Sequence, residues 1–252
     1  MYGLESSYLA RGHALQFKAL AEDVHFMKMP RKYRPRGLEI VYEDRDLLVI
    51  NKEPGLLTMS FHRDELQTAE CVLTAYLRKG AARSRLRAYV VHRLDRETSG
   101  LLIFAKTEAV QQHLKDHWKA VEKEYLAVVH GSLAEKSGTL SSYLAENDDQ
   151  FVYSTDQTKG KWSETQYCVM RENKNFSELK INLLTGRKNQ IRVHFSELGH
   201  PVVGDTKYGP KGKKFERMAL HSRSITFNHP HNGKRMVFEA PVPEFFTRLM
   251  EK

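Results

Sequence analysis

Short apolar runs, each closed by a turn, recur along this chain and favour strands over long helices. Residues 38–42 and 47–52 are rich in Leu, Ile and Val and flank the acidic turn 43–46, a pattern that predicts a β-hairpin. The run 101–105 is apolar throughout and predicts a buried strand. Further strands are predicted at residues 88–91, 124–129, 164–170, 176–184, 218–227 and 235–239.

Helices are predicted between only some of these strands, at residues 68–77, 107–121, 188–198 and 244–250. Thr107 can cap the second helix, and Glu108 suits its first turn. Strands and helices therefore do not alternate regularly, as they would in a parallel α/β fold. The pattern predicts an α+β fold with a mixed, largely antiparallel central sheet and flanking helices.

The charge of the chain predicts a polyanionic partner. Its 252 residues include 40 Lys and Arg against 31 Asp and Glu, a formal net charge of +9. The cations concentrate at residues 28–36, 78–87 and 207–217, the last group including Lys211, Lys213 and Lys214. Any one group is equally consistent with a solvated loop. All three together favour nucleic acid, and no group lies on a clear amphipathic helix of the kind that binds membrane surfaces.

Several classes of protein receive no support. No apolar run approaches the roughly 20 residues of a membrane helix, and the two cysteines, Cys71 and Cys168, lie far apart. These features predict a soluble, cytoplasmic protein with reduced thiols. The common phosphate-loop, dinucleotide and zinc-protease motifs are absent from the sequence. His113 and His117 have a spacing that a metal pair could use, but a solvated helix face explains them better, so no metal site is predicted.

Residues 92–100 form a polar segment, crowded with ionisable groups, between two β-prone runs. Catalytic side chains are commonly placed on such loops, because the flanking strands hold them rigidly. Asp95 lies between Arg93 and Arg96, and these cations favour its ionised form. The residues alone leave two interpretations open: a catalytic carboxylate, or an acid that only forms ion pairs within a turn.

The run HRLDRETSGLLIFAK at residues 92–106 resembles the hallmark of the RluA-type family of RNA pseudouridine synthases. Further segments resemble motifs of that family in the same order along the chain. They lie at residues 51–56, 122–131, 184–194, 198–209, 220–221 and 238–241. The similarity extends from about residue 38 to residue 245, so residues 37–252 are expected to form the pseudouridine synthase catalytic domain, with an active-site cleft across the sheet.

This resemblance implies that the protein converts a uridine within RNA to its C-glycoside isomer. In that reaction the N1–C1′ bond breaks, the uracil rotates, and C5 bonds to C1′, which requires no metal or organic cofactor. Asp95 matches the essential aspartate, Arg192 the arginine that pairs with it, and Tyr125 the active-site tyrosine. Whether Asp95 attacks the sugar, adds to the base or acts as a base stays open.

The resemblance also implies how RNA is held. The target nucleotide must leave its stack, and Arg93 matches the residue that enters the vacated space. Helical spacing places Arg187, Gln190 and His194 on one face, which is expected to support the site and contact RNA. Residues 1–36 are expected to be a basic extension too short for the S4-type RNA-binding domain of many relatives. The expected state is a monomer.

One departure and two alternatives bear on this interpretation. Asn189 stands where the family has His, so hydrogen bonding is retained but imidazole protonation is not. A catalytically silent RNA-binding module is the first alternative, which the intact set of Asp95, Tyr125 and Arg192 disfavours. A nucleoside or sugar hydrolase using Asp95 and Glu97 is the second, and the flanking arginines disfavour it because they suit a polyanion better than a neutral sugar. The sequence leaves both ribosomal and transfer RNA open as substrates.

Overall fold

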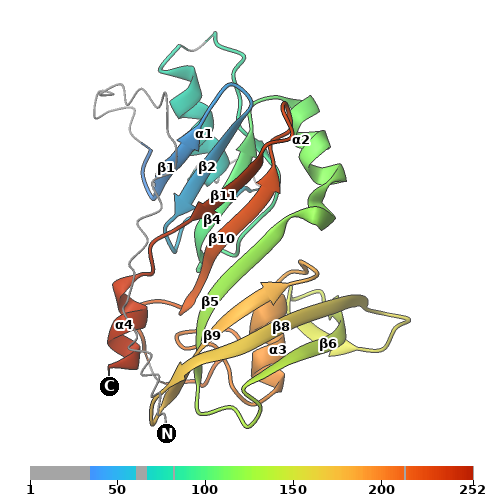
Figure 1. The fold of residues 1–252 in the computed structure, drawn as a ribbon, viewed down its shortest axis with the longest axis vertical. Helices are drawn as coiled ribbons and strands as arrows, with labels where there is room; N and C mark the ends of the chain where they lie inside the picture. Colours follow the sequence, from blue (N-terminus) through green and yellow to red (C-terminus); the bar gives the residue numbers. More distant parts are fainter. Residues whose placement is uncertain (1–34, 61–66, 82, 213, 252) are drawn as a thin grey trace, which may run out of the picture.

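A computed structural model describes residues 35–60, 67–81, 83–212 and 214–251 (Figure 1). The predicted extension falls almost entirely on residues 1–34, outside this part. Within the described residues, eleven strands form one sheet: β1 (Leu38–Glu43), β2 (Leu47–Lys52), β3 (Tyr89–Val90), β4 (Ser99–Ala105), β5 (Glu122–His130), β6 (Ser137–Glu146), β7 (Val152–Thr155), β8 (Lys161–Glu172), β9 (Phe176–Leu183), β10 (Leu220–Asn228) and β11 (Arg235–Glu239).

The strand order is β1-β2-β4-β10-β5-β9-β8-β6-β7, with β3 beside β4 and β11 beside β10. The paired strands run antiparallel except β4 and β10, which run parallel. The helices are α1 (Ala69–Arg78), α2 (Glu108–Asp116), the short 3₁₀ helix η2 (Trp118–Ala120), α3 (Gln190–Glu197) and α4 (Glu244–Met250). The predicted α+β fold with a largely antiparallel sheet is confirmed. In the described part of the chain, no helix is long and apolar enough to cross a membrane.

Strand β4 is buried along its whole length, because both of its faces are covered. Leu102 and Phe104 belong to the core that includes the buried residues of α1, whereas Leu101 and Ile103 belong to the core that includes Leu114 of α2. A strand buried on both faces needs apolar residues at every position. This explains why residues 101–105 show no alternation of apolar and polar residues.

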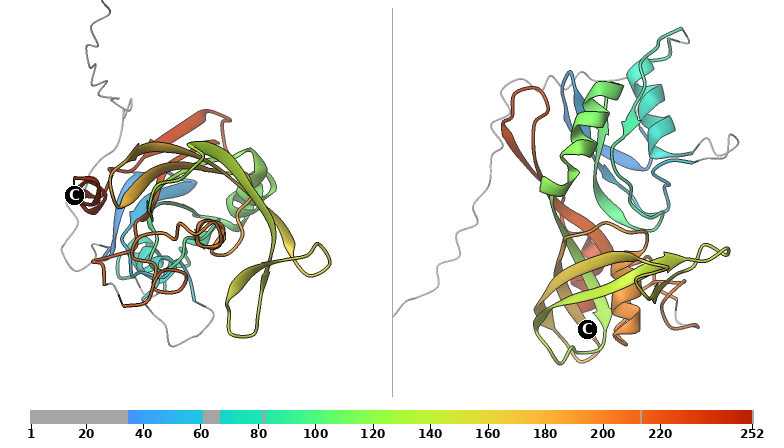
Figure 2. Two further views of the ribbon diagram at one scale, coloured as in Figure 1. Left: turned by 90° about the horizontal axis from the view of Figure 1, so that it is seen from below. Right: turned by 90° about the vertical axis from the view of Figure 1, so that its right-hand side faces the viewer.

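Strands β1, β2, β4, β10 and β11 form one part of the sheet and β9, β8 and β6 another, with β5 running between the two parts (Figures 1 and 2). Strand β4 joins β10 through a short parallel pairing. Gly100 has a φ of +110°, and a Cβ placed on it would lie 2.2 Å from the carbonyl oxygen of Ser222. Only glycine permits this backbone conformation together with so close an approach. The junction therefore fixes the loop that precedes β4 relative to β10 and its neighbour β5.

Three features differ from the sequence-based expectations. The helix predicted to reach residue 121 ends at Asp116, and the chain continues as η2. Strands β6 and β7 were not predicted, because Ser, Thr and Gly dominate β6 and most of its residues are exposed or half-buried. Strand β8 is longer than predicted and pairs with β6, so this part of the sheet forms a largely solvated edge.

Candidate active site

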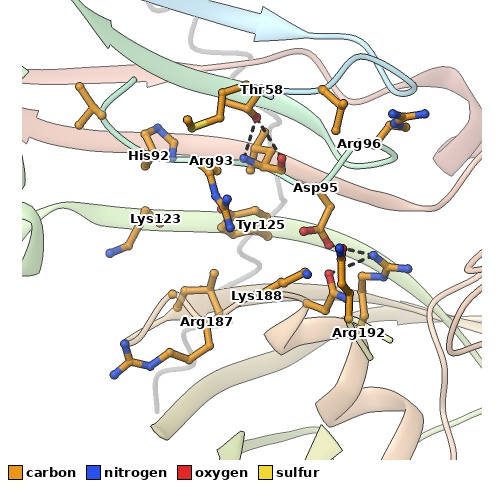
Figure 3. Close-up of a pocket in the computed structure, with 18 of the residues that line it drawn as sticks. Thr58, His92, Arg93, Asp95, Arg96, Lys123, Tyr125, Arg187, Lys188 and Arg192 are labelled. Atoms are coloured by element: carbon orange, nitrogen blue, oxygen red, sulfur yellow. Dashed lines mark hydrogen bonds and ion pairs between the residues drawn. The ribbon is translucent and has the colours of Figure 1, made fainter. Parts of the chain in front are cut away.

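The polar loop before β4 is held by hydrogen bonds on both sides of Asp95, and Figure 3 shows those to Thr58 on one side. The Thr58 hydroxyl accepts from the Leu94 amide at 3.1 Å and donates to the Leu94 carbonyl at 3.0 Å. On the other side, the Arg96 carbonyl accepts from Lys52 Nζ at 3.0 Å and from the Gly55 amide at 2.8 Å. The backbone at Asp95 is therefore fixed from the turn that follows β2.

Lys52 is the clamp on this loop and is only 1% exposed. Its ammonium also donates to the carbonyls of Glu53 at 2.9 Å and Leu56 at 2.8 Å, so three backbone carbonyls surround it. Burial lowers the pKa of Lys52 to about 7, although the negative charges of Glu97 and Asp95 oppose that shift. Since its Nζ atom is surrounded by three backbone carbonyls, Lys52 holds the loop rather than contacting a substrate.

Asp95 forms an ion pair with Arg192, which is itself held by a second acid, Asp205. Arg192 Nη1 donates to Asp95 Oδ2 at 2.9 Å. Its Nε and Nη2 donate to the two oxygens of Asp205 at 2.7 and 2.9 Å. The Asp205 side chain is fully buried, whereas that of Asp95 is 26% exposed. The bidentate contact fixes the plane of the guanidinium and leaves Nη1 to orient Asp95.

The ionisation of this network is set by its own hydrogen bonds. Burial would raise the pKa of Asp205, but the hydrogen bonds and charge of Arg192, together with the amides of Tyr208 and Lys207, lower it overall. Burial would lower the pKa of Arg192, and the two carboxylates raise it instead. The guanidinium and Asp205 therefore both stay charged.

Asn189 takes part in the same network. Its Oδ1 accepts from Arg192 Nη1 at 3.3 Å, and its Nδ2 donates to the Tyr208 hydroxyl at 3.0 Å. The Arg192 guanidinium lies 5.1 Å from the centre of the Tyr208 ring. Asn189 has a φ of +54°, a left-handed conformation that Asn tolerates better than most residues. The hydrogen-bonding capacity expected of this residue is thus used to link Arg192 to Tyr208.

Tyr125 lies on β5 and lines the cleft with its side chain largely buried. Burial raises its pKa to about 12, and the charge of Asp95 acts in the same direction, while a hydrogen bond with Ser222 opposes the shift. The phenol is therefore neutral at physiological pH. It offers an aromatic surface and a hydroxyl donor beside Asp95.

These residues line a cleft of about 550 Å³ between the polar loop, β5, η2 and the segment before α3. Among the described residues that line it, Asp95 is the one acid, and seven are Lys or Arg. In Figure 3, Asp95 and Arg192 lie at one end, which we call the acid end together with Asp205. Lys123 and Arg187 lie at the other end, which we call the cation end, and Arg93 lies between the two.

Gln190 and His194 lie on one face of α3, as the helical spacing predicts. Both side chains are buried, and each has its polar atoms bonded within the protein. Gln190 donates to the Glu164 carbonyl and the Thr165 hydroxyl, and His194 lies between the hydroxyls of Ser142 and Thr165. The two residues fasten α3 to the sheet beneath the cleft, which is the supporting role predicted for this face, and their buried side chains do not favour the predicted contact with RNA.

The other predicted RNA-binding residues are on the surface. Arg93 and Arg187 are exposed and line the cleft, and the Arg187 guanidinium donates to the Trp162 carbonyl at 3.2 Å. Lys211 and Lys214 are exposed, and Lys213 lies outside the described residues. No group of three or more His, Cys, Asp or Glu in the described part of the chain is arranged to hold a metal ion.

Several residues of the site were not singled out from the sequence. Asp205 and Lys52 lie within segments that carry the family resemblance, but no local pattern shows that Asp205 binds Arg192 or that Lys52 binds the Arg96 carbonyl. Lys123 lies two residues before Tyr125, and alternation along a strand could have placed both on one face. Nothing in the sequence points to Thr58.

Comparisons with known proteins show what the chain is similar to. The family model described as RNA pseudouridylate synthase matches residues 46–197. The chain is 36% identical over 220 residues to the uncharacterized RNA pseudouridine synthase YjbO of Bacillus subtilis, covering 86% of this chain and 77% of that protein. It is 35% identical over 239 residues to ribosomal large subunit pseudouridine synthase D of Pasteurella multocida, covering 87% and 72%.

Solved structures show the same similarity. Human RNA pseudouridylate synthase domain containing 1 superposes with a TM-score of 0.65 at 28% identity, covering 82% of this chain and 84% of that one. Human RNA pseudouridylate synthase domain containing 4 shares the fold with a TM-score of 0.70 at 21% identity, covering 84% and 91%.

Proposed function

The chain belongs to the RNA pseudouridylate synthase family and is an RNA pseudouridine synthase; from this premise we propose that it isomerises specific uridines of structured RNA, with Asp95 as the essential carboxylate. The observation that carries the proposal is the position of Asp95. It is the one acid among the described residues that line a cationic cleft, and it is held by a guanidinium that Asp205 locks in place. A protein that only bound RNA would gain nothing from a carboxylate facing phosphates.

Access to the target base requires that the nucleotide leave its stack, at a cost of a few kcal/mol. Arg93 is exposed at the cleft and fits the role of occupying the vacated space, because a guanidinium stacks and hydrogen-bonds at the same time. Arg187 lines the cleft nearby and is available to the RNA backbone. Tyr125 offers the flipped uracil an aromatic surface at the floor of the cleft.

The chemistry needs little besides these groups. As the N1–C1′ bond breaks, positive charge develops at C1′, and the Asp95 carboxylate is the anion placed to stabilise or trap it. The isomer has the composition of uridine, so the balance requires only that a proton leave C5 and a proton reach N1. Because Tyr125 is a neutral phenol, we assign it a hydrogen-bonding and proton-transfer role rather than that of a phenolate base.

We propose ribosomal or transfer RNA as the substrate, acted on by a cytoplasmic monomer whose catalytic domain comprises residues 37–252. The name of the Pasteurella multocida relative refers to the large ribosomal subunit, which makes large-subunit RNA the first substrate to test. Free thiols at Cys71 and Cys168 suit a reducing compartment.

The test is a map of pseudouridines in the RNA of cells that carry or lack the gene, followed by complementation with Asp95→Asn. We expect one or more sites to disappear in the absence of the protein. The variant should restore none of them, because losing the essential group of a catalytic set costs a factor of about 10⁴ or more in rate. It should bind RNA within a few-fold of the unaltered protein.

Substantial turnover by Asp95→Asn would contradict the role of Asp95. RNA binding by the unaltered protein with no product would instead favour the silent RNA-binding module.

A further inference from the structure

Lys123 is a partly buried cation of the cleft to which the reaction assigns no role. It lies on β5 two residues before Tyr125, so both side chains leave the same face of the strand and both line the cleft. Its ammonium lies 5.4 Å from the centre of the Trp118 ring. Figure 3 shows Lys123 at the end of the cleft away from Asp95 and Arg192.

The surroundings hold the Lys123 side chain without neutralising it. The Trp118 and His92 rings are packed together, with their centres 4.5 Å apart. His92 Nε2 accepts a hydrogen bond from the Ile103 amide at 3.1 Å, and burial lowers the pKa of His92 to about 3, so this imidazole is neutral. The ammonium thus lies against an aromatic and neutral support, which attracts a cation but does not cancel its charge.

Two other lysines, Lys180 and Lys106, are each paired with an acid, and Lys123 is not. Next to it on β5, Glu124 binds Lys180 at 2.8 Å, and Lys106 binds Glu43 at 2.6 Å. Within the described part of the chain, Lys123 forms no ion pair, and burial lowers its pKa without an opposing carboxylate. Burial removes part of the water that stabilises the Lys123 ammonium, and no carboxylate takes the place of that water. An anion bound there would therefore stabilise the charge.

We propose that Lys123, supported by Trp118 and His92, binds a phosphate of the RNA strand beside the flipped uridine. The proposal rests on the proposed function, because it places the flipped nucleotide between Lys123 and Asp95. A phosphate is repelled by Asp95 at the acid end, so the opposite end of the cleft is where the strand can pass. Arg187 lies at the same end and adds to the attraction.

The first experiment measures RNA affinity against salt concentration with a short fluorescein-labelled RNA hairpin that carries uridines in its loop. The host protein is Asp95→Asn, so that turnover does not change the probe. In this host, Lys123→Met keeps the packing of the side chain and removes its charge, and Lys123→Arg restores the charge. Lys119→Met removes an exposed charge from the adjacent η2 and is the matched control.

We expect Lys123→Met to weaken binding about tenfold, since a hydrogen bond to a charged group contributes about that factor. The slope of log K against log salt should fall by about 0.7, the change for one phosphate contact on single-stranded RNA. Lys123→Arg should retain most of the affinity, and Lys119→Met should change it less than twofold. An unchanged slope in Lys123→Met overturns the proposal, and so does an equal loss in Lys119→Met.

The second experiment uses the tryptophans as reporters. The chain has two, so Trp162→Phe leaves Trp118, beside Lys123, as the single tryptophan. We expect uridine 5′-monophosphate or uridine 3′-monophosphate to change the Trp118 emission at lower concentrations than uridine or inorganic phosphate does. The more effective isomer identifies which flanking phosphate is bound. Equal responses to uridine and both nucleotides overturn the proposal. These readouts measure binding, so a failure to form pseudouridine would contradict the proposed function and leave the assignment of Lys123 standing.

Discussion

The two ends of the cleft handle charge in opposite ways. At the acid end, Arg192 is shared between Asp95 and Asp205, and each charge has a partner inside the protein. At the cation end, neither Lys123 nor Arg187 forms an ion pair with any described residue. Paired charges fix geometry before the substrate arrives, which is what a reacting group needs. Cations without an ion-pair partner in the protein can instead attract the phosphates of RNA.

The acid end is also not electrically balanced. Two carboxylates share one guanidinium, so the trio carries a formal charge of −1. Asp205 is fully buried and accepts two hydrogen bonds from Arg192 and further ones from the amides of Lys207 and Tyr208. Asp95 accepts one from Arg192 and is partly exposed. The unbalanced negative charge is therefore available on Asp95, the carboxylate that faces the cleft.

Among residues that take no direct part in the reaction, Asp205 is expected to have the largest effect on the rate when it is removed, because it holds Arg192 in place. In Asp205→Ala the guanidinium loses two of its hydrogen bonds and reorients toward Asp95. A misplacement of about 1 Å can cost about 10²-fold in rate, so we expect kcat for pseudouridine formation to fall by about that factor with KM nearly unchanged. Breaking a buried ion pair should also lower the free energy of unfolding by about 3 kcal/mol.

The matched control is Glu122→Ala, which removes an exposed acid bound to Arg235 and should cost less than about 1 kcal/mol. Asp205→Asn should lie between Asp205→Ala and the unaltered protein in kcat, because the amide oxygen still accepts a hydrogen bond. A normal kcat in Asp205→Ala would show that Arg192 is positioned without Asp205. The measurements are single-turnover kinetics and urea denaturation of the same preparations.

The contrast between the two ends shows what the sequence could predict. Asp95 and its partner Arg192 were predicted because both lie in long segments that resemble one family. Asp205 was not predicted, because its contact with Arg192, 13 positions away, leaves no pattern in the sequence around either residue. Gln190 and His194 share a helix face as predicted, but spacing does not reveal whether that face points to solvent or to the sheet. Arg187 precedes the start of α3, so helical spacing does not apply to it.

The strands of the sheet also divide into those that the sequence predicts and those that it does not. The run 101–105 predicted a strand because burial on both faces demands apolar residues throughout, and β4 has that burial. Strand β6 has no comparable run of apolar residues. Most of its positions are exposed or half-buried, so Ser, Thr and Gly can occupy them. Its place in the sheet comes from pairing with β8 and from α3 packed against it.

Lowering the pH tests whether the support beneath the cation end is neutral. The pKa of His92 is about 3 in the folded protein against 6.5 ordinarily. Below pH 6.5 the unfolded chain therefore gains a proton that folded His92 does not, and this stabilises the unfolded state. The free energy of unfolding should decline by up to about 1.4 kcal/mol per pH unit between pH 6.5 and 3 on account of this residue.

The variant His92→Gln keeps an acceptor for the Ile103 amide and removes the titrating group. Urea denaturation at several pH values should show a pH dependence reduced by close to one proton. His221, whose pKa burial also lowers to about 3, should supply part of the remainder. The control His113→Gln changes an exposed histidine of α2 and should leave the dependence as it is. An unaltered dependence in His92→Gln would mean that the pKa of His92 is the same in the folded and the unfolded protein, so that the support beneath the cation end gains a positive charge below about pH 6.5.

The smallest loss of affinity at physiological salt is expected from two exposed lysines, Lys211 and Lys214. Lys211 and Lys214 are solvent-exposed, so each contributes a screened contact at most. If both meet phosphates, the double variant Lys211→Gln/Lys214→Gln should lower the slope of log K against log salt by about 1.4 to 1.8, at 0.7 to 0.9 for each contact. Its loss of affinity at physiological salt should nevertheless be smaller than that of Lys123→Met, because solvent already compensates an exposed ammonium.

The double variant Lys115→Gln/Lys119→Gln, on exposed positions of α2 and η2, controls for the change in net charge. An unchanged slope would place residues 211–214 outside the RNA footprint. An affinity loss larger than that of Lys123→Met would place the main grip on RNA outside the cleft, and the cation end would then serve to orient the strand rather than to hold it.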